Sequence, residues 1–174
     1  MKFLKKIKYI FLVFLMFEGN LAADTPFYLD FRFILNESKA GKEAQNYLKK
    51  KLDSGIKSLQ GKEKALQEEE KKLIQQKKII SAEEYKKKVT SLRGKVAALQ
   101  KERNDLLQEV SKKRAKAKNE LLRTLNPIIK EYMQEKKIRM VVDKKSLLLA
   151  DENLDITDDI IGILNKKLKS IKLN

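Results

Sequence analysis

The sequence predicts an α+β fold that is mostly α, in which a long antiparallel coiled-coil hairpin of two helices stands on a small body of β-strands. Three observations predict it. Of the 174 residues, 37% are charged and only 6 are Gly and 2 are Pro, which favours long helices over a loop-rich fold. Leucines recur at heptad spacing in the centre of the chain. Short segments rich in aromatic or β-branched residues lie on both sides of this centre.

Residues 1–23 are predicted to be a secretory signal peptide. Four lysines lie among the first eight residues, the apolar run YIFLVFLMF follows, and the segment ends in Ala22 and Ala23. The apolar run is shorter than the roughly 20 residues that span a bilayer, and an uncleaved membrane anchor is the alternative. With cleavage near Ala23, the mature chain would be exported and has a net charge of +13.

The mature chain is expected to open with a strand, Phe27–Phe31, that runs into a turn of helix. Aromatic and aliphatic residues alternate there with Asp30 and Arg32. Residues 36–38 (Asn-Glu-Ser) are N-cap candidates for the helix that follows.

The first helix of the hairpin is predicted over Lys39–Ile80, a stretch without Pro. One seam position is apolar throughout. The companion position is apolar at Ile56 but then becomes Glu63, Glu70 and Lys77, so the second seam is weak. The regular heptad residues are Leu52, Leu59, Leu66, Leu73 and Ile80.

A second long helix is predicted to start at Ser81, because Glu84 follows three residues later and the two form a capping box. The break between the helices is short, so we expect them to fold back antiparallel with a tip near residues 79–82. The seam of the second helix is interrupted only at Arg103. It comprises Tyr85, Val89, Leu92, Val96, Leu99, Arg103, Leu106 and Val110.

Three glycines and one proline lie inside the predicted hairpin helices. Gly55, Gly61 and Gly94 cost about 1 kcal/mol each relative to Ala. They are either points of controlled flexibility or substitutions tolerated on a surface. Pro127 removes a backbone hydrogen bond and predicts a kink where the arm meets the body.

Two strands and a helix are predicted after the hairpin. Ile138–Asp143 and Ser146–Ala150 read as strands joined by a turn at residues 144–145. Asp155 or Thr157 is expected to cap the last amphipathic helix. Its predicted buried face comprises Ile160, Ile161, Ile163, Leu164, Leu168 and Ile171.

The two ends of the chain must meet to form one body, residues 24–37 with 138–174, from which residues 38–137 project as an arm. Three short strands and one helix make a poor core and leave sheet edges uncovered. We therefore expect oligomerisation, with strands of several subunits closing into a barrel. The predicted oligomerisation residues are Phe27, Leu29, Phe31, Met140, Val142, Leu147 and Leu149, and Ile160 and Leu164 are further body residues.

The residue types present argue against an enzyme. The chain has no His and no Cys, which excludes the usual zinc, haem and iron–sulfur sites and catalysis by His or Cys. A calcium loop starting at Asp151 fails, because Ile156 and Gly162 stand where Gly and Glu are required. No glycine-rich phosphate loop is found. We therefore expect neither a cofactor nor a metal.

Several motifs carry a family resemblance over essentially the whole mature chain. They are the opening FYLDFRFIL, Gly41, the Lys-rich hairpin, and the C-terminal stretch with Val141-Val142-Asp143 and Asp155-Ile156-Thr157. With these features the chain resembles the Skp/OmpH-type periplasmic chaperones. The resemblance implies a jellyfish-shaped homotrimer, with a β-barrel body built by three subunits and three helical arms around a cavity.

The resemblance also implies a function. The cavity of such chaperones takes in unfolded outer-membrane proteins and prevents their aggregation without ATP, so we expect an ATP-independent periplasmic holdase. The alternative is a coiled-coil structural or adaptor protein of the cell envelope that has no chaperone activity.

The basic excess lies mainly on the outer arm. The whole chain has a net charge of +16, residues 62–118 contribute +9, and residues 138–174 contribute +1. This charge could hold acidic unfolded clients, dock the tip on anionic lipid or lipopolysaccharide, or be a solvated face that splays the arms. The candidate contact residues are Lys71, Lys72, Lys77, Lys78, Lys86, Lys87 and Lys88.

Nucleic acid is a further partner that a basic chain allows, since the pI is near 9.8. Aromatic residues are not interleaved with the lysines beyond Tyr85, and no nucleic-acid-binding fingerprint is present. We therefore expect no nucleic acid in the function.

Overall fold

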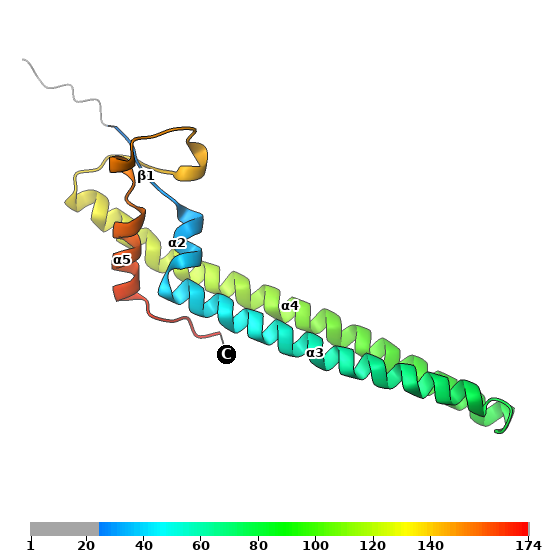
Figure 1. Cartoon of the computed structure of the whole chain (residues 1–174). Coiled ribbons are helices and arrows are strands. Elements are labelled where there is room, and N and C mark those ends of the chain that lie inside the picture. Colours follow the sequence, from blue (N-terminus) through cyan, green and yellow to red (C-terminus); the bar gives the residue numbers. More distant parts are fainter. Residues whose placement is uncertain (1–24, 174) are drawn as a thin grey trace, which may run out of the picture.

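The structure, a computed structural model, describes residues 25–173 and shows a long two-helix arm on a small body (Figure 1). The predicted signal peptide lies outside the described residues. In chain order the elements are β1 (Phe27–Leu29), α2 (Phe31–Glu37), α3 (Lys39–Gln76), α4 (Ala82–Glu135), β2 (Val141–Asp143), the 3₁₀ turns η1 (Lys144–Ser146) and η2 (Glu152–Leu154), and α5 (Thr157–Lys167). The mostly helical α+β class is confirmed.

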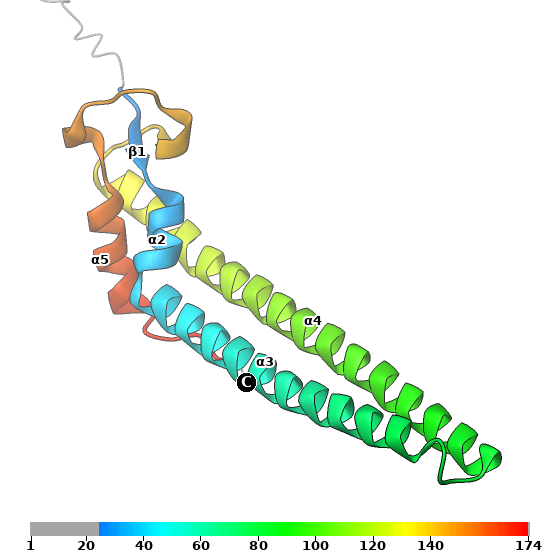
Figure 2. The same cartoon turned by 45° about the vertical axis from the view of Figure 1, so that its right-hand side comes forward.

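The arm is formed by α3 and α4, which run antiparallel and side by side to a tip at residues 77–81 (Figures 1 and 2). The predicted seam is confirmed along most of its length: Leu59, Leu73 and Val110 are buried. Ile56 and Val96 depart from the prediction, since they are 41% and 53% exposed. Two helices packed side by side cannot surround the seam between them, so part of each seam stays in contact with solvent.

Side-chain caps start each of the first three helices. Asp30 accepts a hydrogen bond from the amide of Phe33 at 2.7 Å and starts α2. Ser38 and Ser81 accept bonds from amide groups three residues later, at 3.2 Å in both cases, and start α3 and α4. The serine half of the predicted capping box is therefore formed. The carboxylate of Glu84 pairs with Lys88 at 3.2 Å.

The strands differ from the prediction. β1 ends at Leu29 rather than Phe31, because Asp30 caps α2. β2 covers only Val141–Asp143, and the predicted strand Ser146–Ala150 is wrong: η1 leads into a loop in which Leu149 is 95% exposed. The Asp143 side chain accepts a hydrogen bond from the amide of Lys145 at 3.1 Å and turns the chain into η1.

β1 and β2 pair in parallel, with Phe27 opposite Val141 and Leu29 opposite Asp143. A parallel pair requires a crossover connection, and here the whole arm is that crossover. Among the described residues the sheet has two strands and is not closed into a barrel.

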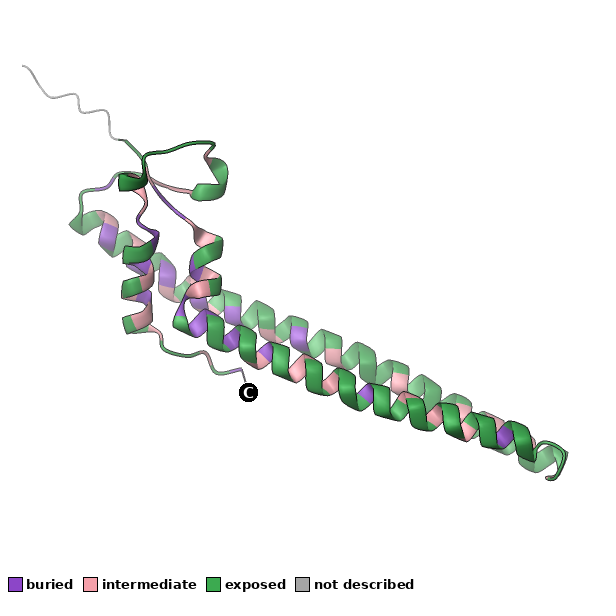
Figure 3. Ribbon diagram, in the orientation of Figure 1, coloured by how far each residue is buried: buried purple, intermediate pink, exposed green. Residues whose placement is uncertain are grey.

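The core of the body lies where α2 and α5 pack on the end of α4, and the buried residues gather there (Figure 3). Ile160 and Leu164 are fully buried, as predicted, and Leu125 and Ile128 of α4 join them. The long helix continues through Pro127 to Glu135. It thus belongs to the arm at one end and to the body core at the other.

Candidate functional site

Among the residues that the structure describes, no compact cluster of metal-binding or unpaired polar side chains is found. Within residues 25–173 there is no group of His, Cys, Asp and Glu that could hold a metal ion. Every buried side-chain nitrogen or oxygen in this range has a hydrogen-bond partner. No helix among them is long and apolar enough to cross a membrane. The candidate functional surfaces are therefore extended ones: a polar junction in the body and the surface of the arm.

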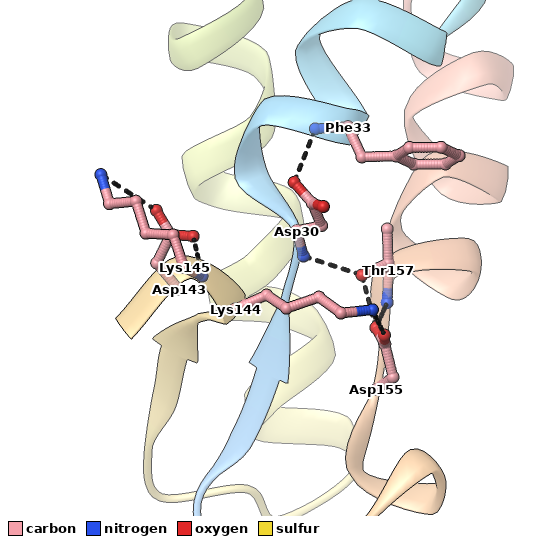
Figure 4. Close-up of polar contacts among 7 residues, drawn as sticks. All are labelled: Asp30, Phe33, Asp143, Lys144, Lys145, Asp155 and Thr157. Atoms are coloured by element: carbon pink, nitrogen blue, oxygen red, sulfur yellow. Dashed lines mark hydrogen bonds and ion pairs between the residues drawn. The ribbon is translucent and has the colours of Figure 1, made fainter. Parts of the chain in front are cut away.

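The polar junction, which we call the body staple, consists of Asp30, Lys144, Asp155 and Thr157 (Figure 4). The hydroxyl of Thr157 donates to Asp155 and accepts a hydrogen bond from the amide of Asp30 at 2.8 Å. Asp155 also accepts from the amide of Thr157 at 2.9 Å and pairs with Lys144 at 3.0 Å. The staple joins the β1–α2 junction, η1 and the start of α5.

Ile156, which lies between Asp155 and Thr157 in the chain, adds a further contact to the body staple. The amide of Ile156 donates to the carbonyl of Tyr28 at 2.9 Å, and its side chain is buried. Ile156 occupies the N-cap position of α5 without a side-chain hydrogen bond, so the prediction of Thr157 or Asp155 at that position is wrong. Asp155, the residue before this N-cap position, nevertheless accepts a hydrogen bond from the amide of Thr157, the first residue of the helix.

Ion pairs connect the two helices along the arm. Lys62 pairs with Glu102, Glu69 with Lys95 at 2.7 Å, and Lys51 with Glu109 at 3.0 Å. These pairs were not predicted from the sequence. All three are open to solvent, which screens the attraction, so each contributes little to stability.

A further interhelical pair lies at the interruption of the seam. Arg103, which breaks the seam of α4, lies 3.3 Å from Glu63, which occupies the weak seam position of α3. The two polar seam positions therefore compensate each other. Opposite charges at facing seam positions were the sequence signal that could have revealed the pair.

The seven candidate lysines near the tip fall into two groups. Lys87 and Lys88 pair with glutamates one turn earlier, at 3.1 and 3.2 Å, and the Lys77 ammonium lies 5.8 Å from the centroid of the Tyr85 ring. The other four have no ion-pair partner among residues 25–173. They are Lys71, Lys72, Lys78 and Lys86.

An apolar groove of about 590 Å³ lies between α3 and α4 in the outer half of the arm. Leu66, Leu92 and Leu99 line it together with the half-exposed Val96, and charged side chains border it. Further apolar side chains on the arm are exposed to solvent: Ile56, Ile74, Ile79 and Leu107. The arm therefore presents separated apolar contacts within a charged surface.

Comparison with known proteins assigns the family. The chain matches the model of the family described as outer membrane protein (OmpH-like) over residues 27–164. The chain belongs to the OmpH-like family. It is 31% identical over 152 residues to an uncharacterized protein of Aquifex aeolicus (strain VF5), which covers 84% of this chain and 93% of that protein. Its structure is similar to the crystal structure of a candidate outer membrane chaperone (OmpH-like) from Caulobacter crescentus CB15, with a TM-score of 0.79, 25% identity, and coverage of 90% and 94% of the two chains.

In this OmpH-like chain, the body residues proposed for oligomerisation differ in how far their side chains are exposed to solvent. Leu29 is buried, whereas Met140 is 57% and Leu149 is 95% exposed. Phe27, Phe31, Val142 and Leu147 are half-buried. Met140 directly precedes β2 and Leu149 lies in the loop after η1, and their contact with another subunit stays a prediction.

The body staple of the OmpH-like chain also shifts two protonation equilibria. Burial favours a raised pKa for Asp155, but the hydrogen bonds from Thr157 and the pair with Lys144 outweigh it and hold the pKa of Asp155 below its ordinary value. The hydrogen bond to Asp155 in turn raises the pKa of Lys144. Both groups are therefore charged at neutral pH, and the staple is an ion pair.

Proposed function

We propose that this OmpH-like protein is an ATP-independent holdase of the periplasm, which binds unfolded outer-membrane proteins and prevents their aggregation. The observation that carries the proposal is the surface of the arm, where apolar side chains such as Val96 and Leu107 stay exposed within a segment of net charge +9. The family and the description of the Caulobacter protein as a chaperone support it.

The arm suits the holding of an unfolded chain because its contacts are small and many. A single half-exposed Val or Leu can bury only a few tens of Å² against a client, which corresponds to about 1 kcal/mol at roughly 25 cal/mol per Å². Contacts of this size form and break readily, so a client is retained without being trapped in one conformation. The basic charge attracts acidic segments over about 10 Å at 0.1 M salt.

We further propose that the protein is a homotrimer. A two-stranded parallel sheet is rarely stable by itself, and its free edges favour pairing with other strands. Met140, directly before β2, and Leu148 and Leu149, in the loop after η1, are exposed and would be buried by neighbouring subunits. Three subunits would close the strands into a barrel and arrange three arms around a shared cavity.

Anionic lipid or lipopolysaccharide is a further proposed partner, and its contact would be the tip. Lys71, Lys72, Lys78 and Lys86 are free of ion pairs among the described residues, so their charge is available to phosphate groups. Export with a signal peptide cleaved near Ala23 would place the mature chain in the periplasm, where such lipids and the proposed clients occur.

The direct test is the suppression of aggregation. A urea-unfolded outer-membrane barrel protein is diluted into buffer with the purified mature chain and no nucleotide, and light scattering is recorded. We expect scattering to be suppressed at about one trimer per client. Undiminished scattering would contradict the holdase and favour the adaptor coiled coil.

A further inference from the structure

The chain continues beyond α5 and returns to the arm. Helix α5 ends at Lys167, and Leu168, whose amide still donates to the carbonyl of Leu164, has an extended backbone. Residues 168–173, which we call the strap, then run without regular secondary structure to the base of the arm, beside α3 (Figures 1 and 2). The strap lies outside the family match, which ends at residue 164.

Apolar side chains of the strap connect two separate cores. Leu168 packs against the body core, Ile171 packs against both cores, and Leu173 is buried in the second core between α3 and α4. In an extended segment, residues two apart point to the same side. Ile171 and Leu173 can therefore pack against the same hydrophobic cluster while Lys172 stays exposed. This cluster at the base of the arm comprises the buried residues Ala44, Leu48, Val110 and Ala117, and the partly buried Tyr47, Leu52 and Leu106 pack around it.

A polar clamp holds the end of the strap. The Lys113 ammonium donates to the carbonyl of Leu173, lies 5.6 Å from the centroid of the Tyr47 ring and 3.7 Å from Glu109. Only 17% of the Lys113 side chain is exposed. Glu109 also pairs with Lys51 of α3 at 3.0 Å. Groups from both arm helices therefore surround the Lys113 ammonium, which in turn holds the backbone carbonyl of Leu173.

We propose that the strap locks the base of the arm to the body and sets how far the arm can swing. The body core and the arm core are otherwise joined by the continuous helix α4 and by the α2–α3 junction. The strap adds a third connection, which lies across the seam just where the arm leaves the body. This role concerns the stiffness of the arm and stands independently of which client the arm binds.

Two measurements test the proposal. The first is hydrogen exchange of the backbone amides at residues 44–52 and 106–117. In Leu173→Asp we expect these amides to exchange about tenfold faster, the order of effect of losing one buried leucine side chain, and the outer arm to be unchanged. The second is the distribution of distances between the tip and the body. The chain has no Cys, so labels on Lys78→Cys and Glu152→Cys are specific.

Matched variants make both outcomes decisive. Ser170→Asp introduces the same charge at an exposed strap position and should leave exchange and the distance distribution as in the parent chain. Labelled chains are diluted into an excess of unlabelled chain so that one arm is observed at a time. Leu173→Asp should broaden the distribution, and Lys113→Met should broaden it to a smaller degree.

The proposal is overturned if Leu173→Asp and Ser170→Asp both match the parent chain in exchange and in distance. If circular dichroism shows that Leu173→Asp has lost helix, the chain ending at Ser170 replaces it, and unchanged exchange in that chain overturns the proposal equally. Neither readout involves a client, so this result and the aggregation assay fail separately.

Discussion

Gly41 and Asp155 show at the residue scale why two of the motifs of this chain are needed. Gly41 lies in the first turn of α3, where a Cβ atom would lie 2.0 Å from the carbonyl oxygen of Leu35. Only glycine lets α2 and α3 approach so closely. Asp155 joins the first turn of α5 to Lys144 by accepting a hydrogen bond from one and pairing with the other. Gly41 fixes the connection between body and arm, and Asp155 holds segments of the body together.

Gly41→Ala should therefore lower the free energy of unfolding by roughly 1–3 kcal/mol, the usual cost of overpacking, because backbone must move. Gly61→Ala and Gly94→Ala are matched controls. A Cβ atom at either position meets nothing within 4 Å, so each should stabilise by up to about 1 kcal/mol. Urea unfolding followed by circular dichroism measures all three. A Gly41→Ala chain as stable as the parent would show that the junction is more plastic than its geometry indicates.

The staple predicts a pH dependence of stability. Because the folded state holds the pKa of Asp155 below its ordinary value of 3.8, its contribution is fully present above that value. The contribution is lost as the pH falls through the lower pKa of the folded state. Asp155→Asn should thus cost about 1–2 kcal/mol at neutral pH, and the difference from the parent should shrink in acid.

Urea unfolding between about pH 2 and pH 7 measures this difference, with Asp158→Asn, at an exposed position in the first turn of α5, as the control. A stability gap between Asp155→Asn and the parent that stays constant over this range would contradict the ion-paired staple.

At the scale of elements, local signals predicted the helices and long-range pairing decided the strands. Ser38, Ser81 and the heptad leucines mark the helices within a few residues, so the hairpin could be read directly. The pairing of β1 with β2 joins segments separated by the whole arm, and no local pattern encodes it. The apolar run at residues 146–150 resembles a strand but has no partner strand among residues 25–173.

The candidate site was predictable in kind but not in detail. The excess of lysine at the tip was visible in composition, yet which lysines are free depends on rotations around the helix and on Glu83, Glu84 and Gln76 nearby. The staple was hidden for another reason. Its members Asp30 and Thr157 are 127 residues apart, and one of the partners is a backbone amide.

The free lysines give the charge hypothesis a sharper test. Replacing Lys71, Lys72, Lys78 and Lys86 by Glu should slow client capture about tenfold at low salt and much less at high salt, because long-range attraction is screened. Replacing the same four by Arg keeps the charge and should leave the rate unchanged. Stopped-flow fluorescence with a labelled client measures the rates. Equal rates for the Glu and Arg variants at low salt would favour a merely solvated face.

The exposed apolar side chains of α4 give a second element-scale prediction. Val96→Lys together with Leu107→Lys should weaken client binding several-fold, since each side chain contributes up to about 1 kcal/mol of contact. Ser91→Lys with Gln108→Lys adds the same charge at exposed polar positions of the same helix and should bind as the parent does. Titration of an acceptor-labelled client measures both. Equal loss in the two pairs would mean that charge, and not apolar contact, governs binding.

At the scale of the whole molecule, the body and the arm have different roles: the body holds the main core, and the arm presents the exposed surface. The body core orders the junction of α2, α4 and α5, while the arm carries most of the charge and the exposed apolar contacts. One chain leaves the edges of a two-stranded sheet and several leucines uncovered. This imbalance is the physical reason to expect several subunits, and a cavity between arms exists only if they assemble.

Native mass spectrometry of the mature chain mixed with a freshly diluted outer-membrane protein shows whether a trimer holds the client in solution. Without nucleotide, we expect a soluble complex of three chains with one client, and a homotrimer when the client is absent. A monomer at micromolar concentration, with the client recovered only in the aggregate, would contradict it.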